Sequence, residues 1–178
     1  MAGIVYSKVK MVVFDVDGVL TDGKIIIDSA GIETKTFNVQ DGTGIKYLLR
    51  SGIKVAFITG RQSVAVALRA RELGVEDVYQ GAKEKLGPYT ELIRKHGLHD
   101  DEVCYVGDDL PDIPVMRRVG VPVAVANCRP EVKNEAAYVT RAEGGRGAAR
   151  EVAEKILKDQ GKWDTILSRY YQDRKSPV

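Results

Sequence analysis

The sequence predicts an α/β protein with a doubly wound, mostly parallel, Rossmann-like sheet and helices on both faces of that sheet. Apolar runs typical of buried strands recur at residues 12–14, 53–59, 103–106 and 121–126. Amphipathic stretches lie between these runs, and strands that alternate with helices favour parallel pairing through right-handed crossovers. Polar residues follow three of the four runs, at the edge where open α/β sheets bind their ligands.

The length and composition suit one domain with one core. The chain has 178 residues, of which 44% are hydrophobic. We expect a single domain over residues 1–160 and a C-terminal tail over 161–178. The tail residues Trp163, Ile166, Leu167, Tyr170 and Tyr171 have the spacing of one helical face, and residues 173–178 are expected to fray.

The charge pattern excludes several classes of partner. A formal net charge of +2 with 29% charged residues gives no electrostatic case for nucleic acid or an anionic membrane surface. No apolar run approaches the roughly 18 residues of a membrane span, and the first residues lack a secretory signal. These features predict a cytoplasmic protein.

Three helices are predicted with defined ends. They cover residues 63–73, 87–95 and 111–119, and Gly74, Gly97 and Gly120 follow as left-handed stops.

One segment interrupts the alternation of strands and helices. Residues 24–28 and 33–39 are β-prone runs around Ser29, Ala30 and Gly31, so they predict a projecting hairpin over about residues 24–39. The three isoleucines at 25–27 are more apolar surface than an isolated ribbon carries. We therefore expect the hairpin to pack against another subunit.

Two carboxylates close the first strand. Side chains alternate along a strand, so Asp15 and Asp17 can point the same way, and Gly18 lets the backbone approach a ligand closely. The pair fits a nucleophile beside a general acid/base, or metal ligands. The alternative is an acidic turn that only closes the strand.

The second strand and the segment before the third helix offer groups for a phosphate. Thr59, Gly60 and Arg61 supply a hydroxyl, an open amide and a guanidinium at the same sheet edge. Further along, Lys85 is our choice for a point charge on the phosphate, with Lys83 as the alternative.

Three more acids follow the strand at 103–106. Asp108, Asp109 and Asp112 suit Mg²⁺, a hard cation with oxygen ligands, whereas helix capping accounts for only one of them.

The ordered set of Asp-Val-Asp-Gly, Thr-Gly-Arg, Lys and Gly-Asp-Asp-x-x-Asp resembles the haloacid dehalogenase superfamily of phosphotransferases over nearly the whole chain. More narrowly, Gly-Val-Leu-Thr-Asp-Gly, Asn-Val-Gln-Asp-Gly at 38–42, Thr-Gly-Arg-Gln-Ser, Tyr-Gln-Gly and Gly-Gly-Arg-Gly at 144–147 are similar to the 3-deoxy-D-manno-octulosonate 8-phosphate phosphatase family. This resemblance implies a tetrameric, magnesium-dependent phosphatase of lipopolysaccharide precursor synthesis.

The resemblance also implies roles for the residues. Asp15 becomes the nucleophile that forms an aspartyl phosphate, and Asp17 the general acid/base. Mg²⁺ is held by Asp15, Asp108 and the main-chain carbonyl of Asp17. Asp109 and Asp112 orient the site without binding the ion themselves. Thr59, Gly60 and Lys85 bind the phosphate.

For the sugar, the family pattern implies a second group of residues. Where the family usually has an arginine in the loop after Asn38, this chain has Gln40. If Arg61 precedes a helix that contains Arg69, both can reach an anionic sugar acid, although plain surface arginines are the alternative. The implied substrate-binding residues are Asp17, Asn38, Val39, Gln40, Asp41, Gly42, Lys46, Arg61, Arg69 and Lys85.

No cap domain is expected. The intervals from Asp15 to Thr59 and from Lys85 to Asp108 are largely used by core elements. Closure of the site is expected from a neighbouring subunit, through the hairpin or the segment 144–147, where Arg146 could reach an anion.

Three alternatives remain at this point. A phosphatase of a nine-carbon sialic-type acid phosphate would carry much the same motifs. A phospho-accepting receiver domain also clusters Asp, Thr and Lys, but it lacks a second acid two positions after the acceptor. A noncatalytic scaffold would be expected to lose an acid or the lysine, and neither is lost.

Overall fold

A six-stranded parallel sheet forms the centre of the molecule, with the strand order β5-β4-β1-β6-β7-β8. This is seen in a computed structural model that describes residues 6–171. The strands are β1 (Met11–Phe14), β4 (Lys54–Ile58), β5 (Asp77–Tyr79), β6 (Val103–Gly107), β7 (Val121–Ala124) and β8 (Tyr138–Val139). The predicted fold is confirmed. Strands β5 and β8 are not predicted from the sequence, because they are too short to show a periodic pattern.

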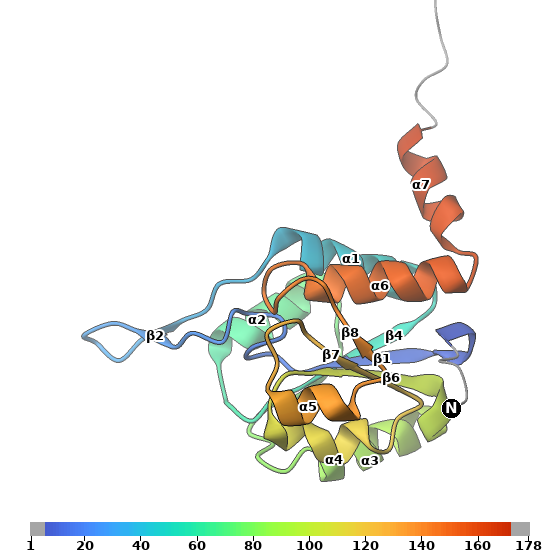
Figure 1. The fold of residues 1–178 in the computed structure, drawn as a ribbon. Coiled ribbons are helices and arrows are strands. Elements are labelled where there is room, and N and C mark those ends of the chain that lie inside the picture. Colours follow the sequence, from blue (N-terminus) through green and yellow to red (C-terminus); the bar gives the residue numbers. More distant parts are fainter. Residues whose placement is uncertain (1–5, 172–178) are drawn as a thin grey trace, which may run out of the picture.

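Helices cover both faces of the sheet (Figure 1). One face carries α1 (Val39–Arg50), α2 (Val64–Leu73) and α6 (Ala148–Asp159). The other carries α3 (Leu86–His96), α4 (Ile113–Met116) and α5 (Pro130–Glu135). Single 3-10 turns lie at Tyr6–Lys8, Asp100–Glu102 and Leu110–Asp112.

The central strand β1 is buried on both sides. Val12 and Phe14 pack in the core under α1, α2 and α6, whereas Met11 and Val13 pack in the core under α3, α4 and α5. A strand with two buried faces needs apolar side chains at every position, which explains the uninterrupted apolar run.

Two of the three predicted helix stops are confirmed. Gly74 and Gly97 have φ angles of 82° and 60° directly after α2 and α3. The stop at Gly120 is wrong, because α4 already ends at Met116 and Gly120 has no positive φ. Instead, the Gly120 N–H donates to the Asp100 carbonyl at 2.7 Å, which fixes the chain just before β7.

The hairpin is present but shorter than predicted. It pairs β2 (Ile26–Ile27) with β3 (Glu33–Thr34) antiparallel and projects away from the helices (Figure 1). The second predicted run does not reach residue 39, because the Asn38 side chain caps α1 by accepting the Gln40 N–H at 2.7 Å. Residues 38–42, which the family resemblance describes as a loop, are the cap and first turn of a helix in this chain.

The C-terminal helical face is confirmed as α7 (Trp163–Tyr171). Ile166 is buried, and the Tyr170 hydroxyl lies 2.9 Å from that of Tyr47 on α1. Tyr170 and Tyr171 are mostly exposed, so only part of this face packs on the domain. The expected fraying at 173–178 lies outside the described residues. Within residues 6–171, no helix has the length and apolar character to cross a membrane.

Candidate active site

Neighbouring parallel strands bring the predicted acids and Thr59 to one edge of the sheet. Asp15 follows β1, Thr59 follows β4 and Asp108 follows β6. Phe14 is in register with Phe57 of β4 and with Val106 of β6, so these three strands end together. The edge is the carboxyl side, as the sequence predicts.

Lys85 is the cation of the site. Its ammonium group lies 2.9 Å from Asp15 Oδ1 and 2.6 Å from Asp112 Oδ1, and the residue is only 4% exposed. Lys83 is exposed. Of the two lysines considered, the structure therefore brings Lys85 to the acids.

Asp112 holds the other groups in place. It is fully buried, and its Oδ2 accepts the main-chain N–H groups of Asp108 at 2.8 Å and Asp109 at 3.1 Å. Its Oδ1 accepts the Tyr105 hydroxyl at 2.6 Å in addition to Lys85. The sequence does not single out Tyr105, because it lies within an apolar strand, where it is indistinguishable from a core residue.

The same edge has the donor set of a divalent cation site. Carboxylate oxygens of Asp15, Asp108 and Asp112 lie within 4.8 Å of one another. Asp112 is already engaged by four donors, whereas Asp108 Oδ1 is buried with no hydrogen-bond partner among the described residues. An unpartnered buried carboxylate oxygen beside a second carboxylate fits a hard cation such as Mg²⁺.

The pKa values of the two acids show how strongly they are crowded. Burial, followed by the charge of Asp112, raises the pKa of Asp15 to about 7, although Lys85 acts against this. Burial, followed by the charge of Asp15, raises the pKa of Asp108 to about 8. Both shifts describe carboxylates that lack sufficient positive charge nearby.

Asp17 is held from the hairpin side. Lys35, just beyond β3, forms an ion pair with Asp17 Oδ1 and lies 3.1 Å from Glu33 Oε1. The Lys35 side chain is 1% exposed, and Asp17 Oδ2 has no hydrogen-bond partner in the described part of the chain. The sequence does not single out Lys35, because a lysine beside a polar hairpin strand is usually exposed.

Thr59 is 1% exposed, and its hydroxyl accepts the Arg61 N–H at 3.4 Å. Its main-chain carbonyl accepts from Ala82, which joins the end of β4 to the segment that leads to Lys85. At Gly60 the nearest atom to an added Cβ would be the Ala82 carbonyl at 3.8 Å, so the backbone is open there.

The two candidate arginines have different surroundings. Arg61 lies 2.7 Å from Glu33 of the hairpin. Arg69, on α2, contacts Glu72 at 2.8 Å and donates to the Asn38 carbonyl at 3.4 Å. The structure thus brings Arg69 to the start of α1 and Arg61 to the hairpin.

The first turn of α1 divides into exposed and buried positions. Val39 and Gln40 are exposed. Lys46, further along α1, is partly buried. Asp41 is buried, and its carboxylate accepts the N–H groups of Gly147 at 3.1 Å and Arg150 at 2.9 Å. Asp41 therefore joins α1 to the start of α6, a contact that the sequence did not indicate. Gly42 packs closely against the Arg69 side chain.

Two further predicted residues, Asp109 and Arg146, are exposed. The Asp109 carboxylate caps the turn at Leu110–Asp112 by accepting the Leu110 N–H at 2.8 Å. Arg146 is mostly exposed and lies 3.5 Å from Glu143. Its neighbour Gly145 donates to the Val19 carbonyl at 2.9 Å, so the segment 144–147 packs behind the turn after Asp15.

Known proteins identify the family of this site. The chain is 48% identical over 158 residues to 3-deoxy-D-manno-octulosonate 8-phosphate phosphatase of Escherichia coli K12, covering 89% of this chain and 84% of that protein. The chain belongs to the 3-deoxy-D-manno-octulosonate 8-phosphate phosphatase family. Residues 76–152 also match the model of the haloacid dehalogenase-like hydrolases.

Solved structures of 3-deoxy-D-manno-octulosonate 8-phosphate phosphatases share this fold. The Moraxella catarrhalis enzyme, solved with a magnesium ion, a phosphate ion and a KDO molecule, has a TM-score of 0.91 and 42% identity over 93% of this chain and 95% of that one. The Yersinia pestis enzyme has a TM-score of 0.88 and 46% identity over 89% of this chain and 86% of that one. The resemblance stated from the motifs is confirmed.

Proposed function

We propose that this chain is a magnesium-dependent phosphatase that hydrolyses 3-deoxy-D-manno-octulosonate 8-phosphate in lipopolysaccharide precursor synthesis. The observation that carries the proposal is the meeting of Asp15, Lys85, Asp108 and Asp112 at the carboxyl edge of β1 and β6. A buried carboxylate with one lysine and an open cation site beside it suits attack on a phosphate ester.

Asp15 is the proposed nucleophile. Its Oδ1 accepts the Val16 N–H at 2.7 Å and faces Lys85, which leaves Oδ2 for attack on phosphorus. The new Oδ2–P bond forms as the bond from phosphorus to the sugar oxygen breaks, giving an aspartyl phosphate and an alkoxide.

Asp17 is the proposed general acid/base. Its Oδ2 gives a proton to the departing alkoxide and then takes one from water as that water attacks phosphorus, which breaks the bond from phosphorus to Asp15 Oδ2 and releases phosphate and the free Asp15 carboxylate. Lys35 holds the other oxygen, Oδ1, so one end of the carboxyl group is fixed while the other stays available.

Positive charge is needed because Asp15 and a phosphate repel each other. A unit charge pair 4 Å apart interacts by about 4 kcal/mol at an effective dielectric near 20. Lys85 offsets part of this, and Thr59 and Gly60 are proposed to bind further phosphate oxygens. Magnesium bound by Asp15, Asp108 and the main-chain carbonyl of Asp17 would supply the remaining charge neutralisation.

The groups for the sugar acid are proposed at the entrance between the hairpin and α1. Arg61 and Arg69 would bind its carboxylate, with Lys46 and the cap and first turn at residues 38–42 around the hydroxyls. Asp109 and Asp112 would support the phosphate side through the turn that they form.

We also propose a cytoplasmic homotetramer in which the hairpin covers a neighbouring site. Three consecutive isoleucines at 25–27 and Ile32 are between 46% and 63% exposed, which is a large apolar patch for a two-stranded ribbon. The catalytic domain would span residues 1–160, with 161–178 as its tail.

A panel of phosphorylated sugar acids, assayed with EDTA and then with added Mg²⁺, tests the proposal. We expect turnover only with Mg²⁺ and a higher kcat/KM for the eight-carbon substrate than for a nine-carbon sialic-type acid phosphate. A higher kcat/KM for the nine-carbon acid phosphate would contradict the proposed substrate and favour the nine-carbon alternative. The Asp15→Asn variant should fold but lose turnover. In the wild type, a stable phosphoprotein without turnover would favour the receiver alternative.

A further inference from the structure

A pocket lies at the opposite edge of the sheet from Asp15. It has a volume of about 260 Å³ and lies between the end of α1, the α6–α7 connection and α7. Because α1 ends at Arg50, shortly before β4 begins at Lys54, this end of α1 is on the amino side of the parallel sheet. The catalytic acids are on the carboxyl side, so the pocket is not part of that site.

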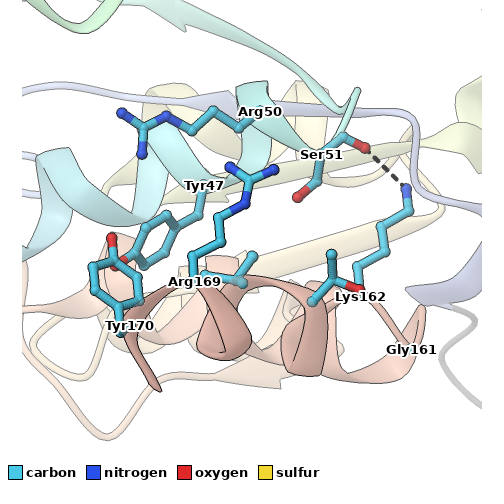
Figure 2. Close-up of a pocket in the computed structure, with 9 residues that line it drawn as sticks. Tyr47, Arg50, Ser51, Gly161, Lys162, Arg169 and Tyr170 are labelled. Carbon is cyan, nitrogen blue, oxygen red and sulfur yellow. Dashed lines mark hydrogen bonds between the residues drawn. The ribbon is translucent and has the colours of Figure 1, made fainter. Parts of the chain in front are cut away.

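The pocket is lined by three cationic side chains and no acidic one. Arg50 comes from α1, Lys162 from the connection and Arg169 from α7. None of the three forms an ion pair with a carboxylate within residues 6–171, although six other arginines in that range do. Figure 2 shows the Arg169 side chain extending from α7 toward α1, where Arg50 lies.

Hydroxyl and apolar groups complete the lining. Ser51 and Thr165 offer hydroxyl groups, and Lys162 Nζ donates to the Ser51 carbonyl at 3.2 Å. The rings of Tyr47 and Tyr170 lie together at one end of the pocket (Figure 2), and buried Ile166 forms part of its wall. Such a lining suits an anion that also has a short carbon chain.

We infer that this pocket binds a small phosphorylated acid with at least two negative charges. Guanidinium groups match phosphate and carboxylate oxygens in a forked geometry, and the three cationic side chains of the lining have no carboxylate partner within residues 6–171 to supply the counter-charge that such a ligand brings. A volume below the roughly 300–1,000 Å³ of drug-sized ligand sites limits the occupant to a few heavy atoms beyond the phosphate. The inference does not depend on the proposed function.

Calorimetric titration of the full chain in EDTA, without substrate, tests this binding. The probes are inorganic phosphate and 3-phosphoglycerate, with glycerol as the neutral control. We expect saturable binding of 3-phosphoglycerate, at least tenfold weaker in the Arg50→Gln/Arg169→Gln double variant. If inorganic phosphate binds equally tightly, the phosphate group alone is recognised; weaker phosphate binding shows that the carboxylate contributes.

Matched variants separate this pocket from general charge and from the catalytic edge. Arg94→Gln removes an exposed arginine on α3, across the sheet, and should bind as the wild type does. The Arg50→Lys/Arg169→Lys variant keeps the charge and should retain most of the affinity. Thr165→Glu places a carboxylate in the pocket at a favourable position in the first turn of α7 and should abolish binding.

Three results would overturn the inference. One is the absence of saturable binding by either anion. Another is unchanged affinity in both the double glutamine variant and Thr165→Glu, which would place the anion at Lys85 instead. The third is a loss of affinity in Arg94→Gln as large as that in the double glutamine variant. Circular dichroism melting establishes whether each variant is folded. If the double glutamine variant is unfolded, the affinity of Thr165→Glu decides whether the anion binds in this pocket.

Discussion

Lys35 forms an ion pair with Asp17 from a hairpin that lies outside the central sheet. The lysine side chain is almost fully buried by this contact and by Glu33, while Asp17 keeps one oxygen without a partner. Asp17, the proposed general acid/base, is therefore linked to the hairpin of its own subunit through Lys35.

Replacement of Lys35 should impair the chemistry more than substrate binding. In Lys35→Ala we expect kcat to fall by about 10- to 100-fold with a smaller change in KM, because Asp17 loses the contact that orients it. Lys24→Ala is the matched control, since Lys24 is an exposed lysine of the same hairpin. Steady-state kinetics on both variants measure this, and equal kcat values would remove Lys35 from the site.

Gly18 is required by the proximity of Asp108. It has φ of 90°, and a Cβ there would lie 2.1 Å from Asp108 Oδ2. Gly18→Ala should thus lower kcat by more than 100-fold by displacing the carboxylate. Gly52→Ala has a similar φ of 78° but no atom within 4 Å of the added Cβ, so it isolates backbone strain. Comparable activity losses in the two variants would attribute the effect to strain alone.

Tyr105 should act on the site through Asp112. Tyr105→Phe removes the hydroxyl that donates to Asp112 Oδ1, so we expect a loss of about 1 kcal/mol in the free energy of unfolding and a several-fold decrease in kcat. Tyr89→Phe removes a similar 2.7 Å hydrogen bond, which the Tyr89 hydroxyl donates to Asp100 and not to Asp112. Urea denaturation and kinetics should show stability losses in both variants and a loss of kcat only in Tyr105→Phe.

The stability of the metal-free protein should fall as the pH rises. The folded-state pKa values of about 7 for Asp15 and about 8 for Asp108 lie above the ordinary aspartate pKa of 3.8. The folded state therefore binds more protons than the unfolded state from about pH 4 upward, so this stabilisation is present below pH 4 and is lost through pH 7 to 8.

Asp108→Asn should flatten this pH dependence. In EDTA, each such group contributes a slope of up to about 1.4 kcal/mol per pH unit, and the variant lacks one of them. Urea denaturation between pH 5 and 8 measures the slope. Added Mg²⁺ should raise the melting temperature of the wild type but not of Asp108→Asn, and identical slopes would contradict the assignment of Asp108.

The hairpin isoleucines should control the oligomeric state. Ile26→Asp places a charge in the exposed apolar patch and should convert the proposed tetramer to smaller species, as measured by light scattering. Leu110→Asp charges another exposed apolar side chain, outside the hairpin, and serves as the control. A wild type that is monomeric at micromolar concentration would contradict the tetramer.

The sequence by itself determined the parallel fold and the acids that its strands deliver. Continuous apolar runs are typical of strands buried on both faces, and the residues that follow them must lie at one sheet edge, so Asp15, Thr59 and Asp108 were predictable together. The family motifs then selected Lys85 over Lys83, which its burial between two carboxylates supports.

Only the tertiary structure decided the contacts between residues distant in sequence. Lys35 reaches Asp17, Tyr105 reaches Asp112, and Asp41 turns to the start of α6, because packing brings the hairpin, β6 and α6 beside these acids. No local periodicity encodes which distant donor will satisfy a buried carboxylate. Local propensity also misplaced the end of α4 and extended the β-prone run to residue 39, where the side-chain cap at Asn38 begins α1 instead.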